Sequence, residues 1–173
     1  MTSDNRAEAG GLTGPLVDPN RVTVSVAELR VETGDATLVT RGLGSCVALA
    51  LYDEAAGIGG LGHFMLPDES EFNQSNDSKF VDTGTDRLVG ELGAAGADPG
   101  RLTARIAGGA SILDIGDTGI GERNVEAVRA SLADHGIPLL GEDVGGEHSR
   151  TVELDAATGG VEIRSPAHET RSL

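Results

Sequence analysis

The feature that most limits how this chain can fold is a run of six apolar residues, Val47–Tyr52, with no polar break. A strand with one face in water alternates apolar and polar side chains, whereas a strand covered on both faces is apolar throughout. Turn residues follow at 53–57, and a second strand, loosened by glycine, follows at 58–66. We therefore expect a hairpin with protein packed against both of its faces.

The apolar periodicity elsewhere predicts further strands and two helices. Val22, Val24 and Val26 alternate with polar residues and indicate a strand that extends towards Val31. Helical spacing begins at Phe80 and ends at a glycine-rich segment, 93–100, and a second helix is expected to open at 124 and end at 135. Shorter strands are expected at 36–40, 102–107, 137–140, 151–154 and 161–163. These elements favour one α/β sandwich domain at 21–166, between an N-terminal tail at 1–20 and a C-terminal tail at 167–173.

The net charge of the chain limits the classes of partner that it can bind and indicates the salt content of its host cell. Asp and Glu number 28 against 13 Lys and Arg, which gives a net charge of −15, and Lys79 is the only lysine. Such an excess repels nucleic acid and anionic lipid, and it suits a host with a salt-rich cytoplasm. The single cysteine excludes an internal disulfide, and we find neither a signal peptide nor a membrane span. We expect a cytoplasmic protein.

That single cysteine, Cys46, immediately precedes the apolar strand, and His63 lies in the second arm of the hairpin. If Asp53 pairs with Ile58, the antiparallel register opposes His63 to Ala48 and puts Cys46 and His63 on one face. A histidine in that position can accept the thiol proton and make the cysteine nucleophilic. The glycines before Cys46 allow backbone N–H groups to face an oxyanion, and the Thr40 hydroxyl can orient the imidazole.

Spacing alone leaves other interpretations open. A lone cysteine in an apolar segment is commonly an inert core residue, and a lone histidine in a strand is commonly structural. A redox-sensing thiol is a third interpretation, which the lack of a resolving cysteine disfavours. The sequence 108–111 (Gly-Gly-Ala-Ser) is consistent either with a lining of the substrate cleft or with a bend after a strand. No Cys/His/Asp spacing indicates zinc, and His148 and His168 lie in polar stretches.

The segments 38–49 and 59–67, which contain this cysteine and histidine, resemble the CheD family of chemoreceptor glutamine deamidases. Further similarity lies at 105–110, 120–124 and 142–146, so the resemblance covers about residues 22–165. One departure is Ser149-Arg150, with His148 beside it, where the family usually has Gly-Arg. The resemblance also implies packed mixed or antiparallel sheets flanked by helices, as in the catalytic domain of deamidating bacterial toxins.

The resemblance implies a protein-glutamine glutaminase that converts receptor glutamines to glutamates and releases ammonia, with no metal or organic cofactor. It assigns Cys46 as nucleophile, His63 as general base and Thr40 as the residue that orients the base. The expected substrate cleft consists of Gly44, Ser45, Phe64, Met65, Gly108 and Gly109. Methyl-accepting chemotaxis receptors are the expected substrates, and a CheC-type phosphatase is an expected partner. The alternative is a regulatory module that binds such a phosphatase with little or no turnover.

Overall fold

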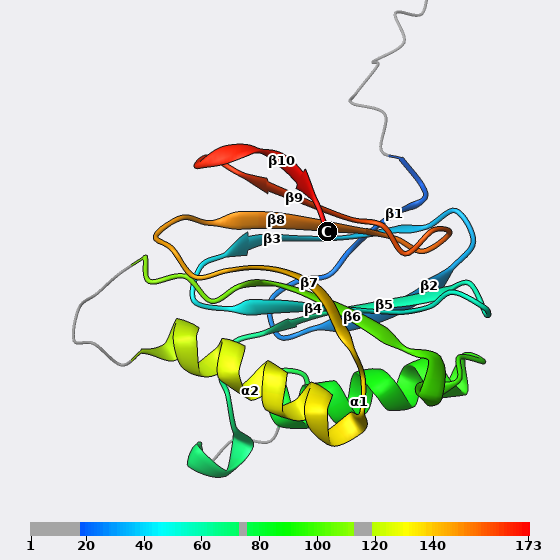
Figure 1. Cartoon of the computed structure of the whole chain (residues 1–173), viewed down its shortest axis with the longest axis horizontal. Helices are drawn as coiled ribbons and strands as arrows, with labels where there is room; N and C mark the ends of the chain where they lie inside the picture. Colours follow the sequence, from blue (N-terminus) through cyan, green and yellow to red (C-terminus); the bar gives the residue numbers. More distant parts are fainter. Residues whose placement is uncertain (1–17, 73–75, 113–118) are drawn as a thin grey trace, which may run out of the picture.

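The computed structural model describes residues 18–72, 76–112 and 119–173 and has three layers (Figure 1). Residues 1–17 of the expected N-terminal tail lie outside this description. The first sheet has the order β1 (Arg21–Thr23), β3 (Thr37–Leu43), β8 (Arg150–Asp155), β9 (Val161–Ser165) and β10 (His168–Ser172). The second has the order β2 (Leu29–Thr33), β5 (Ile58–Phe64), β4 (Val47–Asp53), β6 (Thr103–Gly108) and β7 (Leu139–Val144).

Helices α1 (Val81–Ala94) and α2 (Ile120–His135) cover the face of the second sheet that points away from the first (Figure 1). Short 3-10 turns occupy Glu69–Glu71 and Pro99–Arg101. The pairs β1–β3 and β6–β7 are parallel and the other strand pairs are antiparallel. The expected fold of packed mixed sheets flanked by helices is therefore confirmed. No helix in the described part of the chain is both long and apolar enough to cross a membrane.

The apolar hairpin lies at the centre of the second sheet, as predicted. Every residue of β4 is buried. Leu49 and Leu51 point into the core between this sheet and the helices, while Ala48 and Ala50 belong to the core between the two sheets. The register also has the predicted form, with Asp53 opposite Ile58 and Ala48 opposite His63.

Four of the predicted elements differ from those in the structure. The strand expected from Val22 to Val31 is two strands in different sheets, because the chain turns at 25–28, where Ala27 has a positive φ of 61° and Val26 is 49% exposed. Helix α2 begins at Ile120 rather than at 124, and the strand expected at 137–140 is shifted to Leu139–Val144. Part of the segment expected to be a C-terminal tail forms β10, which pairs with β9.

Candidate active site

Cys46 lies where the chain crosses from the first sheet to the second. Strand β3 ends at Leu43 in one sheet and β4 begins at Val47 in the other. A β-bulge between Thr40 and Leu43, at which Gly42 has a positive φ of 70°, redirects the chain before this crossing. Cys46 is half-buried, so its thiol is held by the fold and still reachable.

His63 lies on the face of β5 that points towards the first sheet. It opposes Ala48, and strand alternation puts the Cys46 side chain, two residues earlier, on the same face. The backbone of His63 is held by the turn before β2, since its N–H donates to the Glu28 carbonyl and its carbonyl accepts from the Ala27 N–H, both at 3.0 Å. The histidine is fully buried.

Thr40 joins the two sheets at this point. Its Oγ1 lies 2.7 Å from Nδ1 of His63 and 2.6 Å from the carbonyl oxygen of Val24, and both threonine and histidine are buried. A carbonyl oxygen can only accept, so the single hydroxyl proton of Thr40 goes to Val24. The hydroxyl oxygen must then accept a proton from Nδ1 of His63.

This chain of hydrogen bonds determines the tautomer of the imidazole. With the proton on Nδ1, the Nε2 atom of His63 carries the free lone pair. Nε2 is buried and has no hydrogen-bond partner among the described residues. A buried nitrogen with a free lone pair, on the face shared with Cys46, is placed to accept the thiol proton.

Burial favours the neutral forms of both Cys46 and His63. It raises the pKa of the Cys46 thiol, which the backbone N–H of the same residue lowers in part. Burial also lowers the pKa of His63 to about 4. At neutral pH the free protein therefore holds a thiol and a neutral imidazole rather than an ion pair.

A cavity of about 440 Å³ opens beside Cys46. Its described lining comes from the crossing before β4, from the residues after β6 and from the start of α2: Gly42, Gly44, Ser45, Cys46, Ala110, Ser111, Ile112, Gly119, Ile120 and Gly121. Of the residues expected in the cleft, Gly44 and Ser45 are in this lining. The cavity is open to solvent, and its volume is sufficient for one extended side chain.

The other expected cleft residues lie elsewhere. Phe64 is fully buried in the core between sheet and helices, so it cannot line the cavity. Gly108 and Gly109 are buried with positive φ and form the bend after β6, where the Gly109 N–H donates to the Cys46 carbonyl at 2.8 Å. Gly109 thereby holds the backbone of Cys46 in place. Met65 is half-buried, and its N–H donates to the Lys79 carbonyl.

Asn124 is a site residue that the sequence reasoning missed. It was expected to open α2, but it lies in the second turn, fully buried. Its side-chain amide donates to the carbonyls of Ser45 and Met65, each at 2.9 Å, and so ties the segment of Cys46 to that of His63. A polar residue on the same helical face as Val128 was the signal that could have revealed it.

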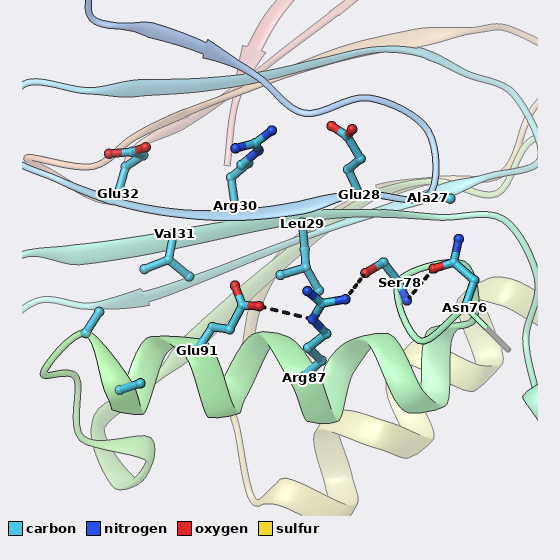
Figure 2. Close-up of a pocket in the computed structure, with 12 residues that line it drawn as sticks. Ala27, Glu28, Leu29, Arg30, Val31, Glu32, Asn76, Ser78, Arg87 and Glu91 are labelled. Atoms are coloured by element: carbon cyan, nitrogen blue, oxygen red, sulfur yellow. Dashed lines mark hydrogen bonds and ion pairs between the residues drawn. The ribbon is translucent and has the colours of Figure 1, made fainter.

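A larger hollow, between β2 and α1, shares no described lining residue with this cavity (Figure 2). Arg87 of α1 lies there, 3.0 Å from both Glu91 and the Ser78 hydroxyl, and Leu29 of β2 faces the helix. Its described lining contains neither cysteine nor histidine. The only described group with the spacing for a metal ion, Asp143, His148 and His168, includes neither Cys46 nor His63.

The chain has well-matched relatives among known proteins. A "Probable chemoreceptor glutamine deamidase CheD" from Haloarcula marismortui is 44% identical over 90% of this chain and 91% of its own length. Proteins of the same description from Natronomonas pharaonis and Moorella thermoacetica are 47% and 45% identical, each over 87% of this chain and over 92% and 93% of their own lengths.

A solved structure, a Bacillus licheniformis hypothetical protein YfiH, has a TM-score of 0.46 at 14% identity over 66% of this chain and 49% of its own, a likeness too distant to inform function. The profile of the family described as "CheD chemotactic sensory transduction" matches residues 65–165. That match begins after Thr40, Cys46 and His63, so it does not depend on these three residues. Together with the full-length similarity to its relatives, it shows that this chain belongs to the CheD family.

Proposed function

We propose that the protein hydrolyses the side-chain amide of glutamine in methyl-accepting chemotaxis receptors, giving glutamate and ammonia, with Cys46 as nucleophile. The observation that carries the proposal is the hydrogen-bond chain from His63 through Thr40 to the Val24 carbonyl. It leaves an unprotonated Nε2 on the face shared with the only cysteine of the chain. The substrate class is supported by the relatives, which are described as probable chemoreceptor glutamine deamidases.

The reaction follows from these positions. As the Cys46 sulfur attacks the amide carbon, Nε2 of His63 takes the thiol proton. The tetrahedral intermediate collapses with transfer of that proton to the leaving nitrogen, which releases ammonia and leaves a thioester on Cys46. Water, deprotonated by the same Nε2, then attacks the thioester carbon, and the departing thiolate recovers the proton. We propose a cytoplasmic location, in which a thiol nucleophile is kept reduced.

The direct test is deamidation of a receptor fragment by the native protein and by Cys46→Ala. We expect the native protein to release ammonia and to convert glutamines to glutamates, detected by mass spectrometry, and the variant to do neither. Cys46→Ala removes only a half-buried sulfur, so its thermal unfolding should match that of the native protein. Deamidation by a folded Cys46→Ala protein at the native rate would refute the assignment.

The CheC-type phosphatase remains a predicted partner, and the same variant separates the two roles. If the protein acts mainly as a regulatory module, Cys46→Ala should still bind the phosphatase and should still support adaptation in cells. If turnover is the main role, adaptation should be lost although binding persists. Chemotactic adaptation in cells that carry the variant therefore decides between them.

A further inference from the structure

Three side chains that are far apart in the sequence meet beside the first sheet. Asp143 comes from β7, His148 from the loop between β7 and β8, and His168 from the start of β10. One nitrogen or oxygen atom of each lies within 4.8 Å of the other two. No zinc spacing is visible in the sequence because β10, which supplies His168, follows the other two only after two intervening strands.

Two of these atoms already have the separation found in a metal site. The Nε2 atom of His168 lies 3.2 Å from Oδ2 of Asp143. Ligand atoms about 2.0 Å from a tetrahedral zinc ion lie about 3.3 Å from each other. His148 is on a loop and packs edge to face against His168, with ring centroids 5.6 Å apart, so a small movement of its ring brings it to the same distance.

The tautomer of His168 leaves the lone pair of its Nε2 free to bind a metal ion. Its Nδ1 lies 2.8 Å from the carbonyl of Glu169, which only accepts, so Nδ1 carries a proton. A backbone carbonyl on one imidazole nitrogen is the usual support of a histidine that binds metal through the other. Nε2 of His168 and Nε2 of His148 are both buried without a hydrogen-bond partner in the described structure. Nε2 of His168 thus faces a carboxylate oxygen, a contact that needs a proton or a cation between them.

The arginines around Asp143 leave one of its oxygens available. Arg150 is buried and donates to Oδ1 from Nε and Nη2, at 3.2 and 3.1 Å, which orients the carboxylate. Oδ2 is approached by Arg171 at 3.4 Å, but that side chain is 53% exposed and can turn into solvent. Arg150 also donates from Nη2 to the Gly145 carbonyl at 2.8 Å, which fixes its orientation.

We propose that Asp143, His148 and His168 form a binding site for a divalent transition-metal ion, with zinc as the ion that best fits two imidazoles and one carboxylate. Water completes the tetrahedron. Bound metal ties the β7–β8 loop to β10, and so attaches the last strand of the chain to the rest of the fold. The site is separate from the deamidation chemistry, which takes place at Cys46.

The test uses the untagged full chain, titrated with zinc by calorimetry and with cobalt by visible absorption. We expect one ion per chain, a visible band typical of tetrahedral cobalt, and a higher thermal midpoint in the presence of zinc. His148→Ala, which changes a loop residue, and His168→Ala should each weaken binding at least about tenfold. His135→Ala is the matched control, because this histidine pairs with Asp86 outside the cluster and should leave binding unchanged.

Cys46 and His63 are the competing site for a soft metal, so the titration is repeated in Cys46→Ala. Binding that persists in Cys46→Ala and is lost in His148→Ala supports the proposal. Binding that disappears in Cys46→Ala, or that survives both His148→Ala and His168→Ala, would overturn it. No binding by the native chain would also overturn it and would assign the His168–Asp143 contact to a proton.

Discussion

Thr40→Val is the substitution that most sharply tests the candidate site. Valine has nearly the same shape as threonine, so the change removes the hydroxyl without opening a cavity. The hydroxyl serves two buried groups, the Val24 carbonyl and the Nδ1–H of His63. Both lose their partner at once, and no solvent reaches them because Thr40 and His63 are fully buried.

The size of the effects on stability and on activity follows from the burial of these two groups. A buried polar group left without a partner costs about 1 to 3 kcal/mol, so the two groups together should lower the free energy of unfolding by about 2 to 6 kcal/mol. Without an acceptor at Nδ1, the proton of His63 can move to Nε2, and the base is then lost from the side of Cys46. Since a positioned general base contributes about 100- to 10,000-fold, we expect receptor deamidation to fall by that factor.

The assay is ammonia release from a receptor fragment, measured alongside the imidazole nitrogen shifts of His63 by NMR, which report its tautomer. Thr40→Ser is the matched control, because it keeps the hydroxyl and loses only a methyl group. It should retain the Nδ1–H tautomer and deamidate within about tenfold of the native protein. If folded Thr40→Val deamidates within about threefold of the native rate, Thr40 does not position the base and the reasoning fails.

Three further measurements test the energetics. Because burial lowers the pKa of His63 to about 4 from 6.5, the unfolded chain binds a proton between these values that the folded chain does not. The free energy of unfolding should therefore fall by about 3 kcal/mol as the pH drops from 7 to 4, and in His63→Gln this contribution should be missing from denaturation curves. Asn124→Ala leaves the Ser45 and Met65 carbonyls without donors, so chemical denaturation should show a loss in the free energy of unfolding of about 2 to 6 kcal/mol. With a net charge of −15, the thermal midpoint should rise with KCl concentration, and a midpoint insensitive to salt would contradict the inferred salt adaptation.

The centre of the fold could be predicted from sequence because local rules agree there. The apolar run at Val47–Tyr52 requires cover on both faces, and the turn after it allows one register, which the structure has. The alternation of apolar and polar residues led to a wrong prediction at Val26. The pattern continues there, but the chain has already turned towards the other sheet. Such a switch between sheets is decided by packing partners that the local pattern does not contain.

The candidate site was partly predictable for the same reason. Cys46 and His63 belong to one hairpin, so their common face follows from its register. Thr40 comes from the other sheet, and its contact with His63 depends on how the sheets stack, which spacing along the chain does not determine. The Val24 carbonyl and the Asn124 amide are beyond sequence rules altogether, since each acts through a backbone or side-chain contact made only in the folded chain.

The pKa shifts of Cys46 and His63 also bear on the function of Cys46. A redox-sensing cysteine needs a low pKa, since oxidants attack the thiolate. Burial here raises the pKa of the Cys46 thiol, and the same burial lowers the pKa of His63, so no cation is present to hold a thiolate in the free protein. In the proposed mechanism, the thiol reacts when an electrophilic carbon lies within reach and His63 takes the proton during attack. That behaviour suits a hydrolase whose nucleophile is inert between substrates, and it disfavours a sensor.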